Sequence, residues 1–255
     1  MTLRRNFGSS RLVRLLSDWA PADAAAPRQD VAERLGAWLG VSDAISLHSA
    51  HQSMKSAPPA KLSDARLPGV LDVEAEFLRV RAALVLAIQT PDSSAARARR
   101  LRSPTGQPGT DAETDVSFAP YRKRYLDLQR HMELRVAALR DHVRRGIGGA
   151  SPQLAQLAKL DAALEQVFGG REQQLLSTVP LFLARRFEEL RKNQVAAGSP
   201  GPVSSLAPAR QQQPHAWQRV FGNELQAVLL AELDDRLQPV AGMVDALNKL
   251  LKKTQ

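Results

Sequence analysis

The stretch from residue 118 to residue 145 constrains the fold most strongly, because large apolar residues recur in it at every third or fourth position. They are Tyr121, Tyr125, Leu128, Met132, Val136, Leu139 and Val143. At 100° per residue these side chains fall within a stripe about 80° wide along one side of a helix. Other elements must cover a stripe of this length, so the sequence predicts a helical bundle.

Six further segments show apolar residues at helical spacing, and breaks rich in Gly and Pro separate most of them. The helices expected are 9–19, 28–47, 68–89, 151–168, 171–197 and 216–252. The apolar content is mostly Leu, Ala and Val, and only 5% of the residues are aromatic, which favours helices over strands. We therefore predict an all-α fold, a multi-helix bundle with about seven helices.

Individual residues predict where some of these helices begin, bend or end. Ser151 and Pro152 are typical of the N-cap and first position of a helix. The pair at 169–170, two glycines, should end that helix. Pro180 should kink or restart the next helix, and Pro239 should bend the last one.

Two stretches rich in Pro, Gly and Ser, 91–117 and 198–214, are expected to be flexible linkers, since they hold too few large apolar residues to order themselves. The first linker also carries clustered basic and acidic residues. The expected organisation is an N-terminal helical unit at 1–90, the linker at 91–117, and a C-terminal helical bundle at 118–255 that contains the loop 198–214.

The positive charge of the chain is concentrated in its middle. The formal net charge is +9. Residues 97–145 alone hold twelve Lys and Arg against six Asp and Glu, a net of +6. A basic balance of this kind favours nucleic acid, an anionic membrane surface or an acidic protein as a partner.

Nine basic residues are the candidate nucleic-acid-binding residues. They are Arg97, Arg99, Arg100 and Arg102 in the linker, and Arg122, Lys123, Arg130, Arg140 and Arg144 on the helix side away from the apolar stripe. Lys and Arg that neutralise phosphates release condensed counterions, which makes such binding depend on salt. No helix-turn-helix pattern is visible, so phosphate contacts without base reading are expected. The alternative is a solvated helix face, with Asp127, Glu133 and Asp141 interspersed among the basic residues.

No catalytic, cofactor or metal site emerges from the sequence. The chain has no cysteine, which excludes disulfides and thiolate chemistry. His48 and His51 are three apart but lack further ligands, and Glu232 and Asp235 lack the His of a helical carboxylate site. The glycines at 146–149 lack the Lys and Ser or Thr of a phosphate loop. We expect a protein that is not an enzyme and binds no cofactor, although a site assembled from scattered helix residues stays open.

No segment has the character of an export signal or a membrane span. The first 19 residues carry four arginines and no long apolar run. The most apolar stretch, 175–187, is interrupted by polar and charged residues, whereas a span needs roughly 18 or more apolar residues. We expect a soluble, cytoplasmic protein with no membrane insertion.

Two parts of the chain resemble a known family. They are YRKRY at 121–125 and LLAELDDRLQPVAGMVDAL at 229–247, the latter preceded by HAW at 215–217. They are similar to a family of uncharacterised Gram-negative bacterial proteins, catalogued as a domain of unknown function. Members tend to be encoded beside a stator-like membrane protein and an OmpA/MotB-like peptidoglycan-binding protein. Such pairs resemble the ion-driven motor of Zorya-type anti-phage defence.

Two functions follow from the charge and the resemblance. The first is a non-enzymatic accessory component of a motor-coupled anti-phage defence system. It would contact DNA non-specifically through the basic helix and Arg-rich arm, and could receive a signal from the cytoplasmic tail of the stator-like membrane motor. The alternative is a structural adaptor that binds a protein partner by helix packing and binds no nucleic acid.

Overall fold

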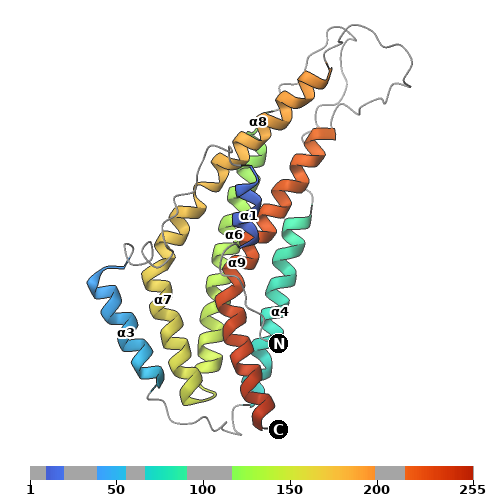
Figure 1. Ribbon diagram of the computed structural model, residues 1–255. Helices are drawn as coiled ribbons and strands as arrows, with labels where there is room; N and C mark the ends of the chain where they lie inside the picture. The colour runs from blue at the N-terminus through green and yellow to red at the C-terminus, as the bar shows by residue number, and fades with distance from the viewer. Residues whose placement is uncertain (1–9, 20–38, 56–66, 91–116, 199–215, 255) are drawn as a thin grey trace, which may run out of the picture. The chain divides into compact units, whose positions relative to one another are not determined.

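The computed structural model describes residues 10–19, 39–55, 67–90, 117–198 and 216–254. Seven helices lie in these ranges (Figure 1). They are α1 (Arg11–Ser17), α3 (Val41–Lys55), α4 (Leu67–Gln89), α6 (Ala119–Gly148), α7 (Pro152–Leu176), α8 (Val179–Gly198) and α9 (Ala216–Thr254). The described ranges contain no strand. The prediction of an all-α bundle with about seven helices is confirmed.

The helices form two compact units. The first comprises residues 1–19, 85–130 and 179–232, and therefore holds α1, α8, the last turn of α4 and the first parts of α6 and α9. The second comprises residues 20–84, 131–178 and 233–255, with α3, α7 and the remaining parts of the same three helices.

This division differs from the sequential order of units expected from the linkers, which separated 1–90 from 118–255. Helices α4, α6 and α9 have 23, 30 and 39 residues. At 1.5 Å per residue they are long enough for each to contribute to both units.

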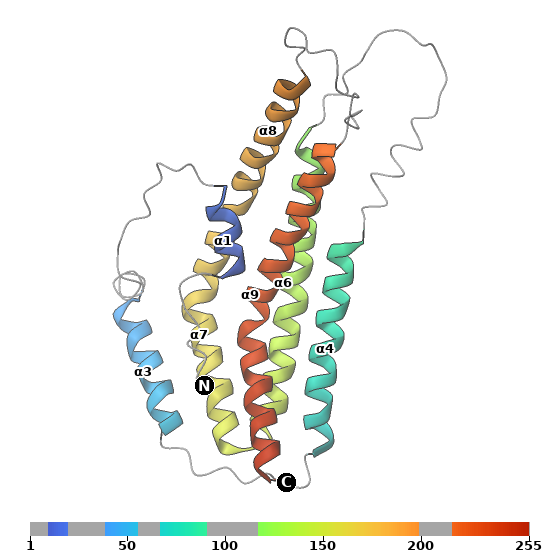
Figure 2. The same cartoon turned by 45° about the vertical axis from the view of Figure 1, so that its right-hand side comes forward.

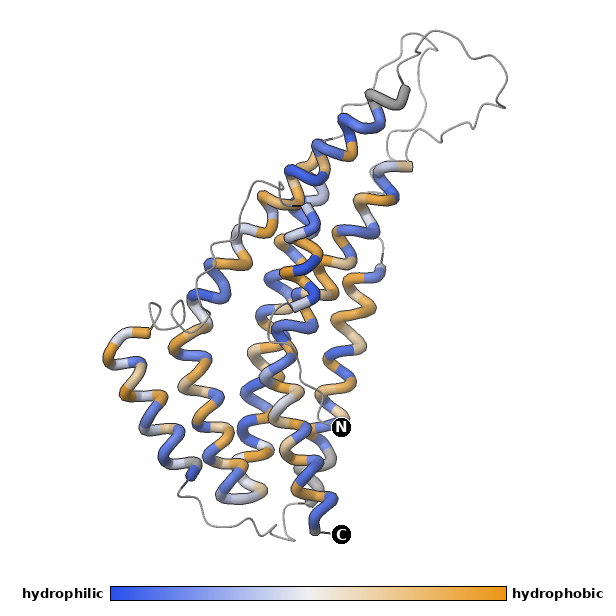
Figure 3. Tube along the Cα trace, viewed as in Figure 1, coloured by the Kyte–Doolittle hydropathy of each residue, from blue (hydrophilic) through white to orange (hydrophobic). Residues whose placement is uncertain are grey.

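In the second unit α3 and α4 lie at the two edges, and α6, α7 and α9 lie between them; the views in Figures 1 and 2 agree on this order. Hydrophobic and hydrophilic residues alternate along α4, α6, α7 and α9 (Figure 3), so each of these four helices has one face suited to packing. The buried apolar residues of the second unit include Val73, Val80, Leu84, Met132, Val136, Leu139, Val143, Leu154, Leu233, Leu237, Val240, Met243 and Leu247. The predicted stripe of α6 supplies four of them.

Aromatic rings form much of the core of the first unit. The ring of Phe187 on α8 lies 5.2 Å from that of Phe221 and 5.1 Å from that of Trp217, both on α9. Phe118 lies 5.6 Å from Phe187, and the ring of Tyr121 meets that of Phe221 edge-on at 5.1 Å. Edge-to-face contacts at these distances are favourable beyond the burial of apolar area.

The predicted start of α7 is confirmed. The side chain of Ser151 accepts a hydrogen bond of 3.2 Å from the backbone N–H of Leu154, and Pro152 opens the helix. Pro is favoured there because the first helical N–H has no partner within the helix. None of the helices in the described ranges has the combination of length and hydropathy required to cross a lipid bilayer.

The prediction that the glycines at 169–170 end a helix is wrong, because α7 continues through them to Leu176. Each glycine lowers helix stability by about 1 kcal/mol relative to Ala but keeps its backbone hydrogen bonds. The break comes at 177–178, and α8 starts at Val179 with Pro180 in its first turn. Pro180 therefore restarts a helix, one of the two outcomes expected for it.

The second expected helix, 28–47, is only partly within the described ranges. Residues 28–38 lie outside them, and the helix that is seen, α3, runs from Val41 to Lys55. Its second half is rich in Ser, His and Gln, so it carries no apolar stripe for a periodicity search to find. Within the second unit α3 packs against α7.

Candidate nucleic-acid interface

Helix α6 carries five of the nine candidate residues; three of them are exposed and two are paired with carboxylates. Arg122, Lys123 and Arg130 belong to the first unit and are exposed. None of the three forms an ion pair with another described residue. Their charges face solvent, as phosphate contact requires.

Arg140 and Arg144, in the second unit, are held by carboxylates of α7. Arg140 donates two hydrogen bonds to Asp161, at 2.8 and 2.7 Å. Arg144 Nε lies 2.7 Å from Asp161, and its Nη1 lies 2.7 Å from Glu165. The two arginine side chains are only 13% and 14% exposed. They are part of the packing between α6 and α7, and the structure does not bring them together with the exposed basic residues.

The Asp161 carboxylate is the centre of this arrangement, and its side chain is 8% exposed. Burial by itself would raise the pKa of Asp161. The hydrogen bonds and positive charges of Arg140 and Arg144 outweigh burial, so the pKa lies below its ordinary value of 3.8. Two guanidinium groups thus keep one buried carboxylate ionised. The sequence offered a signal, since Asp161 follows Leu154 by seven residues and Leu157 by four, a position of the apolar stripe.

Arg124 lies beside the exposed residues but has a structural role. Its Nη2 donates to the backbone oxygens of Ile88 at 3.1 Å and Thr90 at 2.7 Å, at the end of α4. The last carbonyls of a helix have no partner within it, and a cation there also complements the helix dipole. Arg124 therefore caps α4 within the first unit.

Arg186 on α8 is likewise committed to packing. Its guanidinium donates to both carboxylate oxygens of Glu224 on α9, at 2.9 and 2.7 Å, and to Glu189 at 3.0 Å. It also lies 5.9 Å from the ring of Trp19. The hydrogen bond with Glu224 is the largest cause that raises the pKa of Arg186. This arginine joins α8 to α9 in the first unit.

The remaining candidates, Arg97, Arg99, Arg100 and Arg102, lie outside the described residues. The structure therefore neither joins the Arg-rich arm to α6 nor separates the two.

Charge is unevenly divided between the two units. The described residues of the first unit carry eleven Lys and Arg against six Asp and Glu, a net of +5. Those of the second carry thirteen against twelve, a net of +1. The ordered positive charge is therefore concentrated in the unit that contains Arg122, Lys123 and Arg130.

Neither tyrosine of α6 is placed to stack on a base. Tyr125 is fully buried, and the Tyr121 ring belongs to the aromatic core of the first unit. Both rings pack in the core, as their places in the apolar stripe predicted, so any contact with nucleic acid at this surface is made by charged groups.

Glu232 on α9 is a buried carboxylate of the first unit. Its Oε2 accepts a hydrogen bond of 2.6 Å from the Tyr125 hydroxyl, and its Oε1 accepts one of 3.1 Å from the Gln129 amide. From the sequence, Glu232 was considered as a carboxylate without the His of a helical metal site, and its burial was not predicted. Its place in the stripe, seven residues after Leu225, is the signal for burial.

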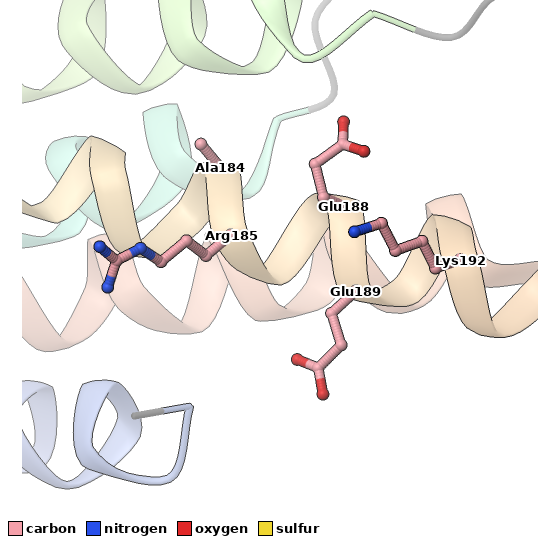
Figure 4. A pocket seen from close by; sticks show the side chains of 5 residues that line it. All are labelled: Ala184, Arg185, Glu188, Glu189 and Lys192. Carbon is pink, nitrogen blue, oxygen red and sulfur yellow. The ribbon is translucent and has the colours of Figure 1, made fainter. Parts of the chain in front are cut away.

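The structure offers little for catalysis or metal binding in its described ranges. His48 and His51 on α3 are both exposed, and no group of three or more His, Asp or Glu is arranged to hold a metal ion in this part of the chain. A surface depression on α8 is lined by Ala184, Arg185, Glu188, Glu189 and Lys192 (Figure 4). All five come from a single helix, which cannot enclose a ligand as a binding pocket does.

Comparison with known protein families gives a match over most of the chain. The model of a protein family described as "Protein of unknown function (DUF3348)" matches residues 1–249. No curated protein and no solved structure matches the chain.

Proposed function

We propose that this chain, which belongs to the family described as "Protein of unknown function (DUF3348)", is a non-enzymatic helical protein that contacts nucleic acid without sequence specificity. The contact is made by the first unit, through Arg122, Lys123 and Arg130 of α6. Arg97, Arg99, Arg100 and Arg102 extend this surface in the proposal.

The observation that carries the proposal is the concentration of charge in the first unit, a net of +5 among its described residues against +1 in the second. Binding to phosphates depends on the number of cations that reach them at once. Three exposed cations on one helix, with no described carboxylate paired to them, can do this without breaking any contact of the fold.

The spacing of the three residues along α6 supports contact with the phosphate backbone of nucleic acid. Lys123 and Arg130 are seven residues apart, which corresponds to two helical turns and about 10.5 Å along the axis. Arg122 lies next to Lys123 on the neighbouring side. Asp127 is exposed between them, which keeps this local field modest. Such a surface favours weak, salt-dependent contact over the reading of base edges.

A fluorescence anisotropy titration with labelled duplex DNA at low salt tests the proposal. The variant R122E/K123E/R130E should weaken binding more than tenfold and flatten the dependence of affinity on salt, since each lost phosphate contact lowers the slope by about one. The matched control is R135E/R145E/K159E, which reverses three exposed cations of the second unit and changes the net charge equally.

The control variant should bind nearly as well as the unmodified protein. An equal loss in both variants would show that only net charge matters and would contradict the assignment to α6. Absence of any DNA or RNA binding by the unmodified protein would remove nucleic acid from the proposal.

A second candidate is an adaptor that binds a protein by helix packing. It is favoured by large apolar side chains that stay exposed in the second unit, such as Leu78 on α4 and Leu134 on α6. Pulldown with the neighbouring gene products separates the two functions. An adaptor keeps its partner in the R122E/K123E/R130E variant, whereas a nucleic-acid-dependent complex is lost.

The cellular setting proposed is a motor-coupled anti-phage defence system of the Zorya type, in which the chain is a cytoplasmic accessory component. Its partner there is the cytoplasmic tail of the stator-like membrane protein. The resemblance of the two sequence stretches at 121–125 and 229–247 is what motivates this setting. Deleting the gene and complementing it with R122E/K123E/R130E, followed by plaque counts, tests whether protection requires the basic surface.

A further inference from the structure

Helix α4 carries a second apolar row on the side opposite its buried one. Ala75, Leu78 and Ala82 step by three and four residues and lie about 180° around the helix from the buried row formed by Val73, Val80 and Leu84. All three are exposed, and the exposed fraction of Leu78 is 54%. In Figures 1 and 2, α4 stands at the edge of the second unit with no described helix on its outer side.

Charged residues flank this row in a repeated order. On one flank Asp72 is followed by Arg79, and on the other Glu74 is followed by Arg81; acid and base are seven positions apart each time. Both flanks are therefore acidic at the start of α4 and basic two turns later. This arrangement complements a copy of itself that runs in the opposite direction.

We propose that this face of α4 is a contact between two copies of the chain, related by a two-fold axis with their α4 helices antiparallel. Ala75 of each copy packs beside Leu78 of the other. Glu74 then lies near Arg81 of the second copy, and Asp72 near Arg79. The inference goes beyond the proposed function, since it concerns a surface of the second unit and needs no nucleic acid.

The size and charge of the residues support a second copy as the occupant. A two-fold contact requires a patch that is complementary to itself, and the order of charges on both flanks meets that requirement. Small residues in the row allow two helices to approach at the lower end of the usual 8–10 Å. A parallel arrangement would bring like charges together, with Glu74 beside Asp72 and Arg81 beside Arg79 of the second copy, whereas the antiparallel one pairs opposite charges on both flanks.

The existing contacts of these arginines leave donors for a second copy. Arg79 Nε donates to Glu76 at 2.7 Å, and Arg81 lies 3.8 Å from Asp234 with both side chains about half exposed. A guanidinium has five N–H donors in a planar fork. Each arginine can therefore keep its present neighbour and also donate hydrogen bonds to a carboxylate of the second copy.

Sedimentation velocity of the full chain over a concentration series, without nucleic acid, tests the proposal. The unmodified protein should shift from monomer to dimer, and L78E should raise the dissociation constant more than tenfold. The matched control is L175E, because Leu175 on α7 of the same unit is exposed to 55% and the substitution is the same. Thermal unfolding by circular dichroism should show that both variants stay folded.

Charge exchange tests the antiparallel arrangement. E74K alone and R81E alone should each weaken the dimer, and E74K/R81E should restore it, because the exchanged charges meet again across the two-fold axis. A monomeric unmodified protein throughout the series, or equal dissociation by L175E, would overturn the proposal. An E74K/R81E variant whose dimer stays as weak as those of the two single variants would overturn the antiparallel arrangement.

Discussion

The hydroxyl of Tyr125 donates a hydrogen bond of 2.6 Å to the carboxylate of Glu232, across 107 residues of sequence. Both residues are fully buried, and they join α6 to α9 within the first unit. A carboxylate taken out of water is tolerated only when its oxygens accept hydrogen bonds. This contact therefore fixes which face of α9 meets α6 more strictly than the surrounding aliphatic residues do.

Replacing Tyr125 by Phe should lower the free energy of unfolding by about 2 kcal/mol. The ring would still fill its place, but a buried carboxylate would lose a donor, and hydrogen bonds to charged groups contribute about 1.5–3 kcal/mol. Urea denaturation of Y125F, E232Q and the double variant gives the coupling between the two residues. A double variant whose loss equals the sum of the single losses would contradict a direct interaction.

Asp161 should matter far more to stability than Asp141, although both contact Arg144. The Asp161 side chain is 8% exposed and binds two arginines, whereas Asp141 is 61% exposed. Removing one partner of a buried ion pair costs about 3–5 kcal/mol, and an exposed pair contributes about 0–1 kcal/mol. Urea denaturation should therefore show a large loss for D161A and almost none for D141A. Similar losses in the two variants would contradict the assigned roles.

The same carboxylate should make stability fall in acid. The pKa of Asp161 in the folded protein is below its ordinary value of 3.8. A lowered pKa stabilises the fold above that ordinary value, and the stabilisation is lost as the pH falls through the folded value. The difference in unfolding free energy between the unmodified protein and D161N should be constant from pH 7 to about pH 5 and shrink below about pH 4. A difference that grows in acid would contradict the lowered pKa.

The sequence was sufficient for the features that depend on neighbouring residues. The apolar stripe of α6 predicted its length and its buried side, and the Ser151–Pro152 pair predicted the start of α7, because periodicity and capping are local properties. The sequence was insufficient at the glycines of 169–170, because the low helix propensity of Gly is small enough for the packing of α7 to offset it. It was also insufficient for Arg140, which was expected on an exposed basic surface but donates to the buried Asp161.

The residues whose roles were missed share a physical reason. Arg140 lies outside the stripe of α6, and whether it meets water or a carboxylate depends on which helix packs against that side of α6. Asp161 and Glu232 each occupy a stripe position, which indicates burial but does not name the partner. Partner choice is set by contacts between residues distant in sequence, here 21 residues for Arg140 with Asp161 and 107 for Tyr125 with Glu232.

Helix α3 should open independently of the rest of the second unit. None of its residues with a described side chain is buried, and Val41 and Ile45 are 80% and 64% exposed. A helix with so little buried apolar area has a low free energy of local unfolding. Its amides should exchange with deuterium faster than those of α6 at the same pH.

A proline in each helix separates local from global stability. Ser49 on α3 and Ala137 on α6 are both exposed and lie well inside their helices. S49P and A137P therefore each remove one backbone hydrogen bond and bring the proline ring against the carbonyl one turn earlier, which costs about 3 kcal/mol or more. S49P should lower helical ellipticity while leaving the midpoint of thermal unfolding almost unchanged, because α3 melts and the remaining helices keep their core. A137P should lower that midpoint by many degrees, since α6 runs between its neighbours and supplies Val136 and Leu139 to the core. An equal drop in both variants would mean that α3 unfolds together with the rest of its unit.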